Sequence, residues 1–206
     1  TLALNDFKMA MLNFDQYLFE KTYNKLLATN SFRDVFLTEF LALLGEIGNL
    51  WTTNTIDPMH ERFISTLIKQ KILVNIERVQ TNQEADGKVF VLFTPLNEVH
   101  DIGLLYLHFE LILKGYRSIF LGTSIPTKDL HDMQNIFKDI TYVSYFTVEP
   151  APSDVNKYLR DFEKTVLKVR GEKLHVIGNS TSSVSRDELS DKIKIHDSLT
   201  DLIDFL

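Results

Sequence analysis

Residues 89–93 form an uninterrupted apolar run, Val-Phe-Val-Leu-Phe, which constrains the fold more than any other feature of the chain. A strand with one face in water alternates apolar and polar residues, whereas a continuous run of this length is typical of a strand covered on both faces. Such strands occur in parallel sheets whose crossover connections are helices. The chain beyond residue 88 is therefore expected to be an α/β domain with helices on both sides of a sheet.

The sequence after this run alternates between strand and helix patterns. Further strands are expected at residues 118–121, 142–146, 174–177 and 193–195, with helices at 98–114, 128–137, 153–169, 186–192 and 199–205. This order predicts a doubly wound, five-stranded parallel sheet over residues 88–206. Ligands of such sheets bind at the carboxyl ends of the strands, so the functional site is expected in the loops that follow them.

Residues 1–80 have helical periodicity instead. Capping residues and an Asp-Pro start signal indicate helices over residues 13–28, 31–48 and 57–76. Helices joined by short loops predict an N-terminal bundle of the four-helix type. The polar, aperiodic stretch 81–87 is the expected linker between the bundle and the α/β domain.

Composition excludes several classes of protein. The 206 residues include no cysteine, which removes thiolate catalysis, cysteine-based zinc sites and disulfides. No apolar run approaches the roughly 20 residues that a membrane-spanning helix needs. The net charge is −6, with 8 basic and 11 acidic residues before Gly87 and 14 and 17 after it, so neither part has the basic character of a nucleic-acid-binding domain. We expect a cytoplasmic protein.

The loop after the first strand contains residues suited to an axial metal ligand. Residues 97–103 read Asn-Glu-Val-His-Asp-Ile-Gly. His100 can present one ring nitrogen to a metal, while the Glu98 carboxylate holds the other N–H and fixes the tautomer. Gly103 lets a bulky ligand approach the backbone. Taken alone, this short motif is also compatible with a solvated or helix-capping role.

Two later segments make the pattern more specific. Ser144-Tyr145-Phe146 ends the third strand, and Gly178-Asn179 follows the fourth. In this order the segments resemble the cobalamin-binding domain, which has a flavodoxin-like (Rossmann-like) fold. The resemblance implies that His100 is the lower cobalt ligand, that Glu98 orients it and that Val99 and Gly103 lie beside the cofactor. It also implies that Ser144, Gly178 and Asn179 contact the nucleotide tail, although Asn179 stands where the family has a second glycine.

The N-terminal part resembles the helical cap of light-responsive MerR-type transcriptional regulators. Trp51 and Glu61 match the cap positions that cover the upper face of adenosylcobalamin in that family. Arg62 replaces the histidine that follows the glutamate, and Thr52 stands where photo-adduct-forming sensors have another histidine. The resemblance therefore implies cofactor contacts from Trp51, Glu61 and Arg62, and adenosylcobalamin as the preferred form. Light sensing is less well supported than cofactor binding, because neither Arg62 nor Thr52 can replace a histidine on cobalt.

This resemblance leads to the expectation of a sensory and oligomerisation module that is not itself an enzyme. The protein would bind cobalamin, form a homo-oligomer and serve as a photoreceptor. It would contact DNA only through an N-terminal winged helix-turn-helix that is absent from this chain. No membrane partner is expected.

Two alternatives remain open. Corrinoid carrier subunits of methyltransferase systems have a similar length, the same order of bundle and sheet, and a His-Asp-Ile-Gly run like residues 100–103. Their motif usually begins with aspartate, whereas Glu98 stands here. The second alternative is a degenerate family member that no longer binds cobalamin, as Thr52, Arg62 and Asn179 would allow.

Overall fold

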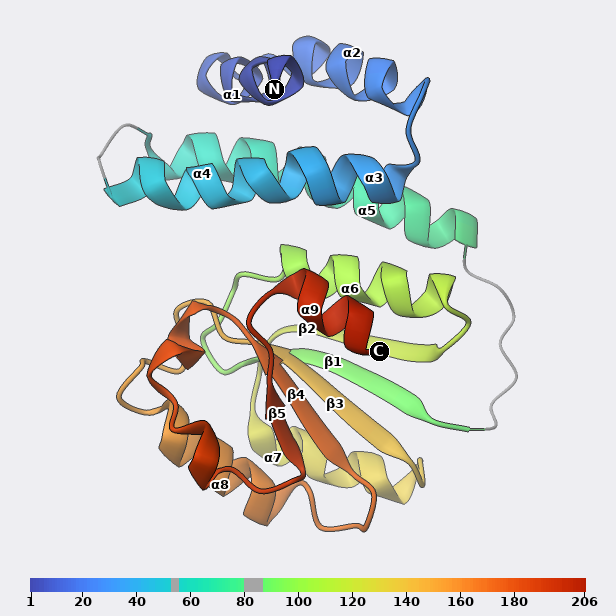
Figure 1. Cartoon of the computed structure of the whole chain (residues 1–206), viewed down its shortest axis with the longest axis vertical. Helices are drawn as coiled ribbons and strands as arrows, with labels where there is room; N and C mark the ends of the chain where they lie inside the picture. The colour runs from blue at the N-terminus through green and yellow to red at the C-terminus, as the bar shows by residue number, and fades with distance from the viewer. Residues whose placement is uncertain (53–55, 80–86) are drawn as a thin grey trace. The chain divides into compact units, whose positions relative to one another are not determined.

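The computed structural model describes residues 1–52, 56–79 and 87–206, with the side chains of Trp51, Thr52 and Glu188 left out (Figure 1). The chain divides into two compact units, Thr1–Asn75 and Ile76–Leu206, and each is described by itself. The division falls within helix α5, Pro58–Val79. The predicted linker at 81–87 lies almost wholly outside the described residues, so the domain limits 1–80 and 88–206 stay a prediction.

The first unit is helical. Its helices are α1 (Leu2–Asn13), α2 (Gln16–Leu27), α3 (Phe32–Val35), α4 (Leu41–Thr52) and the first part of α5, and a π-helical turn at Phe36–Phe40 joins α3 to α4. The predicted helix start at Asn13 is wrong by two residues, because Asn13 is the last residue of α1 and Asp15 is the N-cap of α2. Phe14 takes a left-handed conformation (φ 53°) that ends α1, and the Asp15 carboxylate caps α2 by accepting from the Leu18 amide at 2.9 Å.

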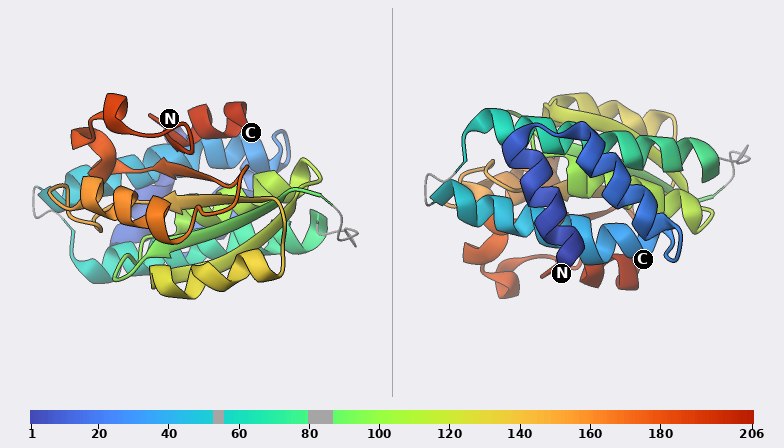
Figure 2. Two further views of the ribbon diagram at one scale, coloured as in Figure 1. Left: turned by 90° about the horizontal axis from the view of Figure 1, so that it is seen from below. Right: turned by 90° about the horizontal axis from the view of Figure 1, so that it is seen from above.

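Aromatic side chains fill the interior of the helical unit. The buried rings of Phe7, Phe19 and Phe40 lie 5.1–5.8 Å apart, and Tyr23 stacks on Phe40 at 5.9 Å. Seen from above, α1 and α2 run side by side across the α3–α4 helix, which brings these rings together (Figure 2, right). Aromatic rings bury a large area each, so this cluster supplies much of the unit's hydrophobic stabilisation.

The second unit contains the predicted five-stranded, all-parallel sheet. Its strands are β1 (Val89–Pro95), β2 (Arg117–Ile125), β3 (Ile140–Tyr145), β4 (Lys173–Ile177) and β5 (Ile193–Ile195). They lie in the order β2-β1-β3-β4-β5, so β1 is an interior strand between β2 and β3, and all seven of its residues are buried. The expectation drawn from the apolar run at 89–93 is confirmed.

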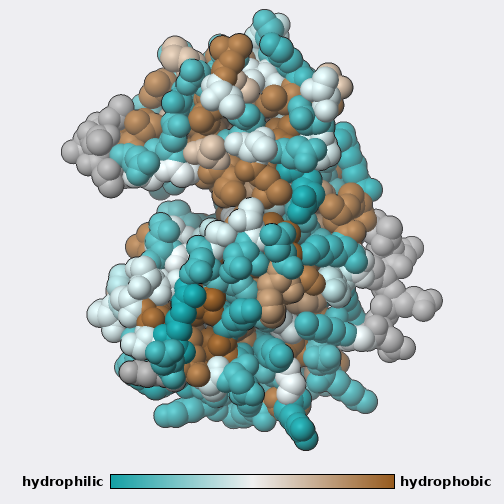
Figure 3. All heavy atoms as spheres, viewed as in Figure 1, coloured by the Kyte–Doolittle hydropathy of each residue, from teal (hydrophilic) through white to brown (hydrophobic). Residues whose placement is uncertain are grey.

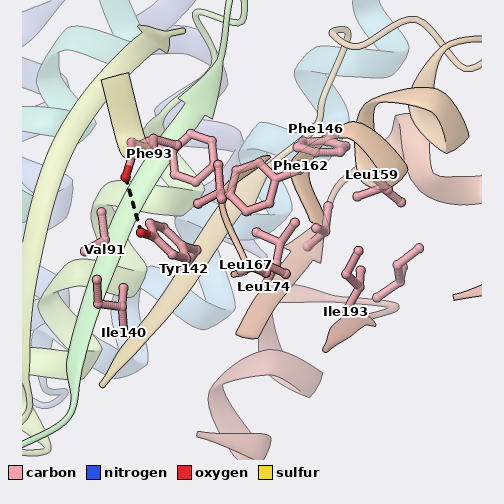
Figure 4. Close-up of a cluster of buried hydrophobic side chains, with 14 of the residues drawn as sticks. Val91, Phe93, Ile140, Tyr142, Phe146, Leu159, Phe162, Leu167, Leu174 and Ile193 are labelled. Atoms are coloured by element: carbon pink, nitrogen blue, oxygen red, sulfur yellow. Dashed lines mark hydrogen bonds between the residues drawn. The ribbon is translucent and has the colours of Figure 1, made fainter. Parts of the chain in front are cut away.

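Helices cover both faces of this sheet (Figures 1 and 2). Helices α6 (Ile102–Leu113) and α9 (Leu199–Phe205) lie on one face, and α7 (Thr127–Leu130) and α8 (Val155–Thr165) lie on the other. Under α8, the rings of Phe93 and Phe162 stack at 5.7 Å (Figure 4). The Tyr142 hydroxyl donates to the Leu130 carbonyl at 3.4 Å in the same cluster.

Two predicted helices are largely replaced by 3₁₀ turns. Residues 128–137 form the short α7 and a 3₁₀ turn at His131–Asn135, and residues 186–192 contain only the 3₁₀ turn Arg186–Glu188. A side-chain hydroxyl competes with helical hydrogen bonding in the second of these segments. The Ser190 hydroxyl accepts from the Lys192 amide at 3.3 Å.

The surface is mixed in character. On the face shown in Figure 3, hydrophilic and hydrophobic residues are interspersed over both units. Among the described residues, no helix combines the length and the apolar character that crossing a membrane requires.

Candidate functional site

The turn after β1 is fastened to the end of β2. The Thr94 hydroxyl donates to the Glu98 carbonyl at 2.6 Å and accepts from the Ser124 amide at 3.0 Å. The Asn97 amide donates to the Ser124 hydroxyl at 3.0 Å, and both residues have positive φ angles (68° and 57°). Asparagine is among the residues that tolerate this conformation best. These bonds hold residues 97–100 at the carboxyl edge of the sheet.

The Glu98 side chain is the centre of the hydrogen bonding at this edge. Its Oε1 lies 2.6 Å from His100 Nδ1 and accepts from the His100 amide at 2.9 Å. Its Oε2 accepts from three successive backbone amides, those of residues 147, 148 and 149, at 3.1, 2.7 and 2.9 Å. One carboxylate therefore joins the loop after β1 to the loop after β3.

The electrostatics of this arrangement fix the state of the imidazole. Burial acts to raise the pKa of Glu98, but hydrogen bonds from His100 and from the Val148 and Glu149 amides outweigh it and lower the pKa to about 2. A carboxylate that stays ionised binds the N–H form of His100 Nδ1. Nε2 is then the nitrogen that a metal would take, and 43% of the His100 side chain is exposed to meet one.

A single imidazole, that of His100, is the metal-binding group at this edge, which suits a metal ion that a macrocycle already coordinates. Throughout residues 1–52, 56–79 and 87–206, no group of three or more His, Asp or Glu side chains is placed to hold a metal ion. The edge instead offers one imidazole, flanked by the exposed apolar side chains of Leu96, Val99 and Val148. A corrin supplies four ring nitrogens to cobalt, so it needs from the protein one axial ligand and an apolar surface. The residues present fit this group.

Ser144 and Gly178 lie where neighbouring strands end at the same edge. Ser144 is fully buried, and its hydroxyl donates to the Phe93 carbonyl at 2.9 Å, so a ligand could use only its oxygen as an acceptor. Gly178 has φ 129°, and a Cβ there would overlap the Phe146 backbone. Glycine is required for this close approach. The next residue, Asn179, is exposed. Their roles in tail binding stay predictions.

Gly103 contacts a side chain of the protein itself. A Cβ at Gly103 would lie 2.5 Å from Cε2 of Tyr145 and 3.0 Å from its Cζ. The sequence predicts that this glycine makes room for the cofactor, whereas in the structure the Tyr145 ring fills the space. Tyr145 also lines a cavity of about 450 Å³ at the ends of β4 and β5.

The predicted cap residues belong to the helical unit. Glu61 and Arg62 lie in the first turns of α5, partly exposed and exposed respectively. The Trp51 and Thr52 backbones end α4, but their side chains are outside the described part of the structure. His60, the next candidate for an upper ligand, accepts from the Asp57 amide at 3.1 Å through Nδ1 and stacks on Phe14 at 4.8 Å. The cap assignment stays a prediction.

Sequence reasoning missed two features of this edge. The three amides that bind Glu98 carry no signal in residue types, because any residue could donate them. Tyr145 is different, since it lies inside the Ser144–Phe146 segment of the motif. An aromatic side chain between the two motif positions could have been noted as a candidate wall of the site.

A buried histidine pair lies on β4 and directly after β5, with His175 within β4 and His196 following Ile195. His175 Nδ1 and His196 Nε2 are 2.9 Å apart, and His196 Nδ1 lies 3.2 Å from the Asp201 carboxylate. Both rings contact Phe205 at 5.2 Å. Burial lowers the pKa of His175 to about 3 and also lowers that of His196. The two imidazoles are therefore uncharged near pH 7, and both are bonded within the protein.

The helical part is similar to a known protein family. Residues 3–74 match the B12 binding domain family. No curated protein matches the sequence.

A solved structure shares the fold over almost the whole chain. The Methanosarcina barkeri monomethylamine corrinoid protein has a TM-score of 0.74 at 13% identity, covering 97% of this chain and 94% of that one. A cobalamin-binding protein from Desulfitobacterium hafniense has a TM-score of 0.46 at 15% identity, covering 100% and 97%. The methanol:cobalamin methyltransferase complex of Methanosarcina barkeri has a TM-score of 0.43 at 14% identity, covering 99% and 78%.

The first of these likenesses shows the fold, and the family match covers residues 3–74, which precede the sheet in the sequence. The predicted architecture of a helical region followed by a Rossmann-like sheet is confirmed. Residues 3–74 are similar to the B12 binding domain family, and the chain shares its fold with a corrinoid protein.

Proposed function

We propose that this chain is a corrinoid carrier, which binds cobalamin or a related corrinoid with His100 as the lower cobalt ligand. It would present the cobalt to a methyltransferase partner and would not itself be an enzyme. The observation that carries the proposal is the Glu98–His100 pair, with Nδ1 held at 2.6 Å by a buried carboxylate. The B12 binding domain match and the fold shared with a corrinoid protein support it.

A bound corrinoid would supply a cobalt centre that accepts and releases a methyl group. The protein's residues would control the lower side of that centre. His100 would donate its Nε2 lone pair, and Glu98 would raise the basicity of the ring by holding the Nδ1 proton. The amides of residues 147–149 would keep the carboxylate in place through the exchange. Leu96 and Val99 would exclude water beside the imidazole.

The MerR-type sensor reading is the second candidate. It rests on the resemblance of Trp51, Glu61 and the motif around His100, and it requires adenosylcobalamin and a response to light. The fold likeness to a corrinoid protein favours the carrier. Arg62, exposed on α5, is a side chain that cannot ligate cobalt after photolysis.

One experiment tests whether the chain binds a corrinoid and distinguishes the carrier hypothesis from the sensor hypothesis. The chain is incubated in the dark with methylcobalamin or adenosylcobalamin and desalted, and its visible spectrum and oligomer mass are recorded before and after green light. A carrier should retain the methyl form and keep its mass in the light. Preference for the adenosyl form with a light-dependent change in mass would favour the sensor. Failure to retain any corrinoid would contradict both.

The role of His100 is tested on the retained cobalt(II) form. With ¹⁵N-labelled histidine, the electron paramagnetic resonance spectrum of the wild-type protein should show hyperfine splitting from one axial histidine nitrogen. His100→Ala should lose that splitting. His131→Ala, which removes an exposed histidine, is the matched control and should keep it. Splitting that survives in His100→Ala would contradict the assignment.

A further inference from the structure

The amino edge of the sheet, where all five parallel strands begin, carries most of the positive charge in residues 88–206. Of the fourteen basic residues in this range, nine lie at the strand starts or in the loops that lead into them. They are Lys88, Lys114, Arg117, Lys138, Lys168, Arg170, Lys173, Lys192 and Lys194. The same segments contain three acidic residues, of which Glu172 is buried. The edge opposite to that of His100 is therefore basic, although the whole chain has a net charge of −6.

Three of these lysines, Lys88, Lys173 and Lys194, form one group on the face of the sheet that α9 covers. Lys194 is the register partner of His175, and its Nζ lies 3.5 Å from the centre of the Phe205 ring in α9. Lys173 precedes His175 by two positions on β4, so the two side chains leave the sheet on the same face. The charges of all three lysines act on His175, whose ring contacts Phe205 at 5.2 Å.

This lysine group has no carboxylate partner within residues 1–52, 56–79 and 87–206. The contacts of Lys88 and Lys194 are with the ring faces of Phe90 and Phe205, at 4.7 and 3.5 Å. By contrast, two lysines of the helical unit form ion pairs with glutamates at 2.6–2.8 Å. The positive charge of the lysine group is thus left for a partner outside the described part of the chain.

The lysine group is accessible and its charges are close together. All three side chains are exposed. Burial of part of the side chain lowers the pKa of Lys88, Asp139 raises it, and the charge of Lys173 lowers it again. Phe205 lies beside the group and is 52% exposed. Like charges near each other repel, so a negatively charged surface that covers them lowers the electrostatic energy.

We propose that the lysine group and Phe205 form a docking surface for an acidic segment of a partner protein. The segment would place carboxylates against the three ammonium groups and an apolar side chain against the Phe205 ring. Aromatic side chains are enriched among the anchors of protein interfaces, and complementary charges around them steer the encounter. The proposal does not depend on corrinoid binding, because the surface lies at the opposite edge of the sheet from His100. A partner held here would leave the His100 edge of the sheet free.

The distribution of charge favours a short acidic segment over a nucleic acid. Proteins bind the nucleic-acid backbone by neutralising many phosphates along its length. A long polyanion would extend from the basic edge toward the rest of the unit. Of the seventeen acidic residues in residues 88–206, fourteen lie outside the basic edge and would repel it. A short segment can meet the three lysines alone.

The test uses the whole chain and a short fluorescein-labelled peptide of glutamates around one central phenylalanine. Fluorescence anisotropy gives the dissociation constant, and the affinity should fall as the ionic strength rises. The variant Lys88→Gln/Lys173→Gln/Lys194→Gln should bind the peptide about 3–150-fold more weakly, the range for three exposed ion pairs. The matched control is Lys128→Gln/Lys157→Gln/Lys164→Gln, which removes three exposed lysines from α7 and α8 and should keep the wild-type affinity.

The role of Phe205 is tested with a second peptide, in which alanine replaces the central phenylalanine. The wild-type protein should bind this peptide more weakly than the first, whereas Phe205→Ala should bind both equally. This comparison is made within each protein, so a change in the stability of Phe205→Ala does not affect it. An equal preference for the first peptide in both proteins would exclude Phe205 from the surface.

Other results would overturn the proposal. Absence of peptide binding by the wild-type protein at low ionic strength would do so, and so would equal loss in the two triple variants. Tighter binding to phosphatidylcholine–phosphatidylserine vesicles or to a DNA duplex than to the peptide would exclude the choice of a protein partner. A wild-type mass that doubles at low ionic strength, but not in the Lys88→Gln/Lys173→Gln/Lys194→Gln variant, would assign the surface to a second copy of this chain. Corrinoid retention is measured separately, so the two proposals fail independently.

Discussion

Two histidine–carboxylate pairs in the sheet unit use the same residue types in opposite ways. At the end of β1, the carboxylate is buried and the imidazole is 43% exposed. After β5, the His196 imidazole is buried and 53% of the Asp201 side chain is exposed. Glu98 holds one nitrogen of His100, whereas both nitrogens of His196 are bonded inside the protein.

This difference shows how burial decides the chemistry of a histidine. A buried carboxylate fixed by three amides makes an orienting group for an exposed ring, which suits an axial metal ligand. A buried ring bonded on both sides has no nitrogen to offer and contributes to stability instead. Sequence spacing alone does not distinguish the pairs, since His196 also has an acidic residue within five positions.

The largest expected effect comes from breaking the first pair. Glu98→Gln keeps the shape but removes the charge that three amides and His100 share. We expect the free energy of unfolding to fall by about 2–4 kcal/mol, because charge-assisted bonds to a buried group are lost. Corrinoid affinity should fall about 10–100-fold, as for other residues that orient a metal ligand.

Urea denaturation and absorbance titration measure these two losses. Asp161→Asn, on the exposed side of α8, is the control and should change neither quantity. Wild-type affinity in Glu98→Gln would show that the carboxylate does not orient His100.

The next largest effect is a loss of stability at acid pH, which we expect from the buried His175–His196 pair. The unfolded chain takes up a proton on His175 near pH 6.5, but the folded protein does so only near pH 3. The free energy of unfolding should therefore decrease as the pH falls from 6.5 to 4.5, by at most about 1.4 kcal/mol per pH unit for this residue. Lys88, Lys194 and Lys173 act in the same direction, because their charges disfavour a protonated His175.

Chemical denaturation at several pH values measures how steeply the free energy of unfolding changes with pH. The pKa of His108 is also lowered, to about 4, so this residue contributes to the same pH dependence. The variant His108→Gln measures that contribution separately. Glu98 contributes only below pH 4.5, since its unfolded carboxylate is already ionised above that value. A slope that is unchanged in His175→Leu would contradict the assignment of the acid sensitivity to the buried pair.

A smaller effect is expected from His175→Leu at pH 7. The change leaves His196 Nε2 buried without its partner, which should cost about 1–3 kcal/mol of unfolding free energy. The axial-histidine splitting from cobalt should stay, because His175 lies in the other cluster. Loss of that splitting would mean that the two clusters are not independent.

The smallest effect should come from Asp201→Asn. Its contact with His196 is 3.2 Å long and its side chain is half exposed, so the loss should be under about 1 kcal/mol. Thermal unfolding of Asp201→Asn and of Glu98→Gln, measured under the same conditions, compares the two losses of stability. Equal destabilisation of the two variants would remove the distinction between the buried and the exposed carboxylate.

Residue patterns predicted much of the fold because the strong signals are local. The run at 89–93 indicated a strand covered on both faces, and the alternation after it indicated a parallel sheet. The helix at 186–192 was predicted wrongly because the Ser190 hydroxyl binds a backbone amide there in place of a helical carbonyl. The reversal at Phe14 was missed because a phenylalanine in a left-handed conformation carries no sequence signal.

The candidate site was predicted in part. Glu98 and His100 are two residues apart, so their contact follows from short spacing. The amides of residues 147–149 are about fifty positions away from Glu98 and could not be assigned from residue types. Tyr145 was within the motif, but its contact with Gly103 depends on how β3 lies beside the start of α6.

The sequence by itself determined the α/β class, the position of the fully buried interior strand and the contact between Glu98 and His100, because periodicity and near spacing encode these features. Only the tertiary structure decided that Glu98 is held ionised by a distant loop, that the Tyr145 ring fills the space before Gly103, and that His196 is internally bonded. The reason is physical. Burial, which sets the pKa of a carboxylate and the availability of a ring nitrogen, depends on which distant segments pack together.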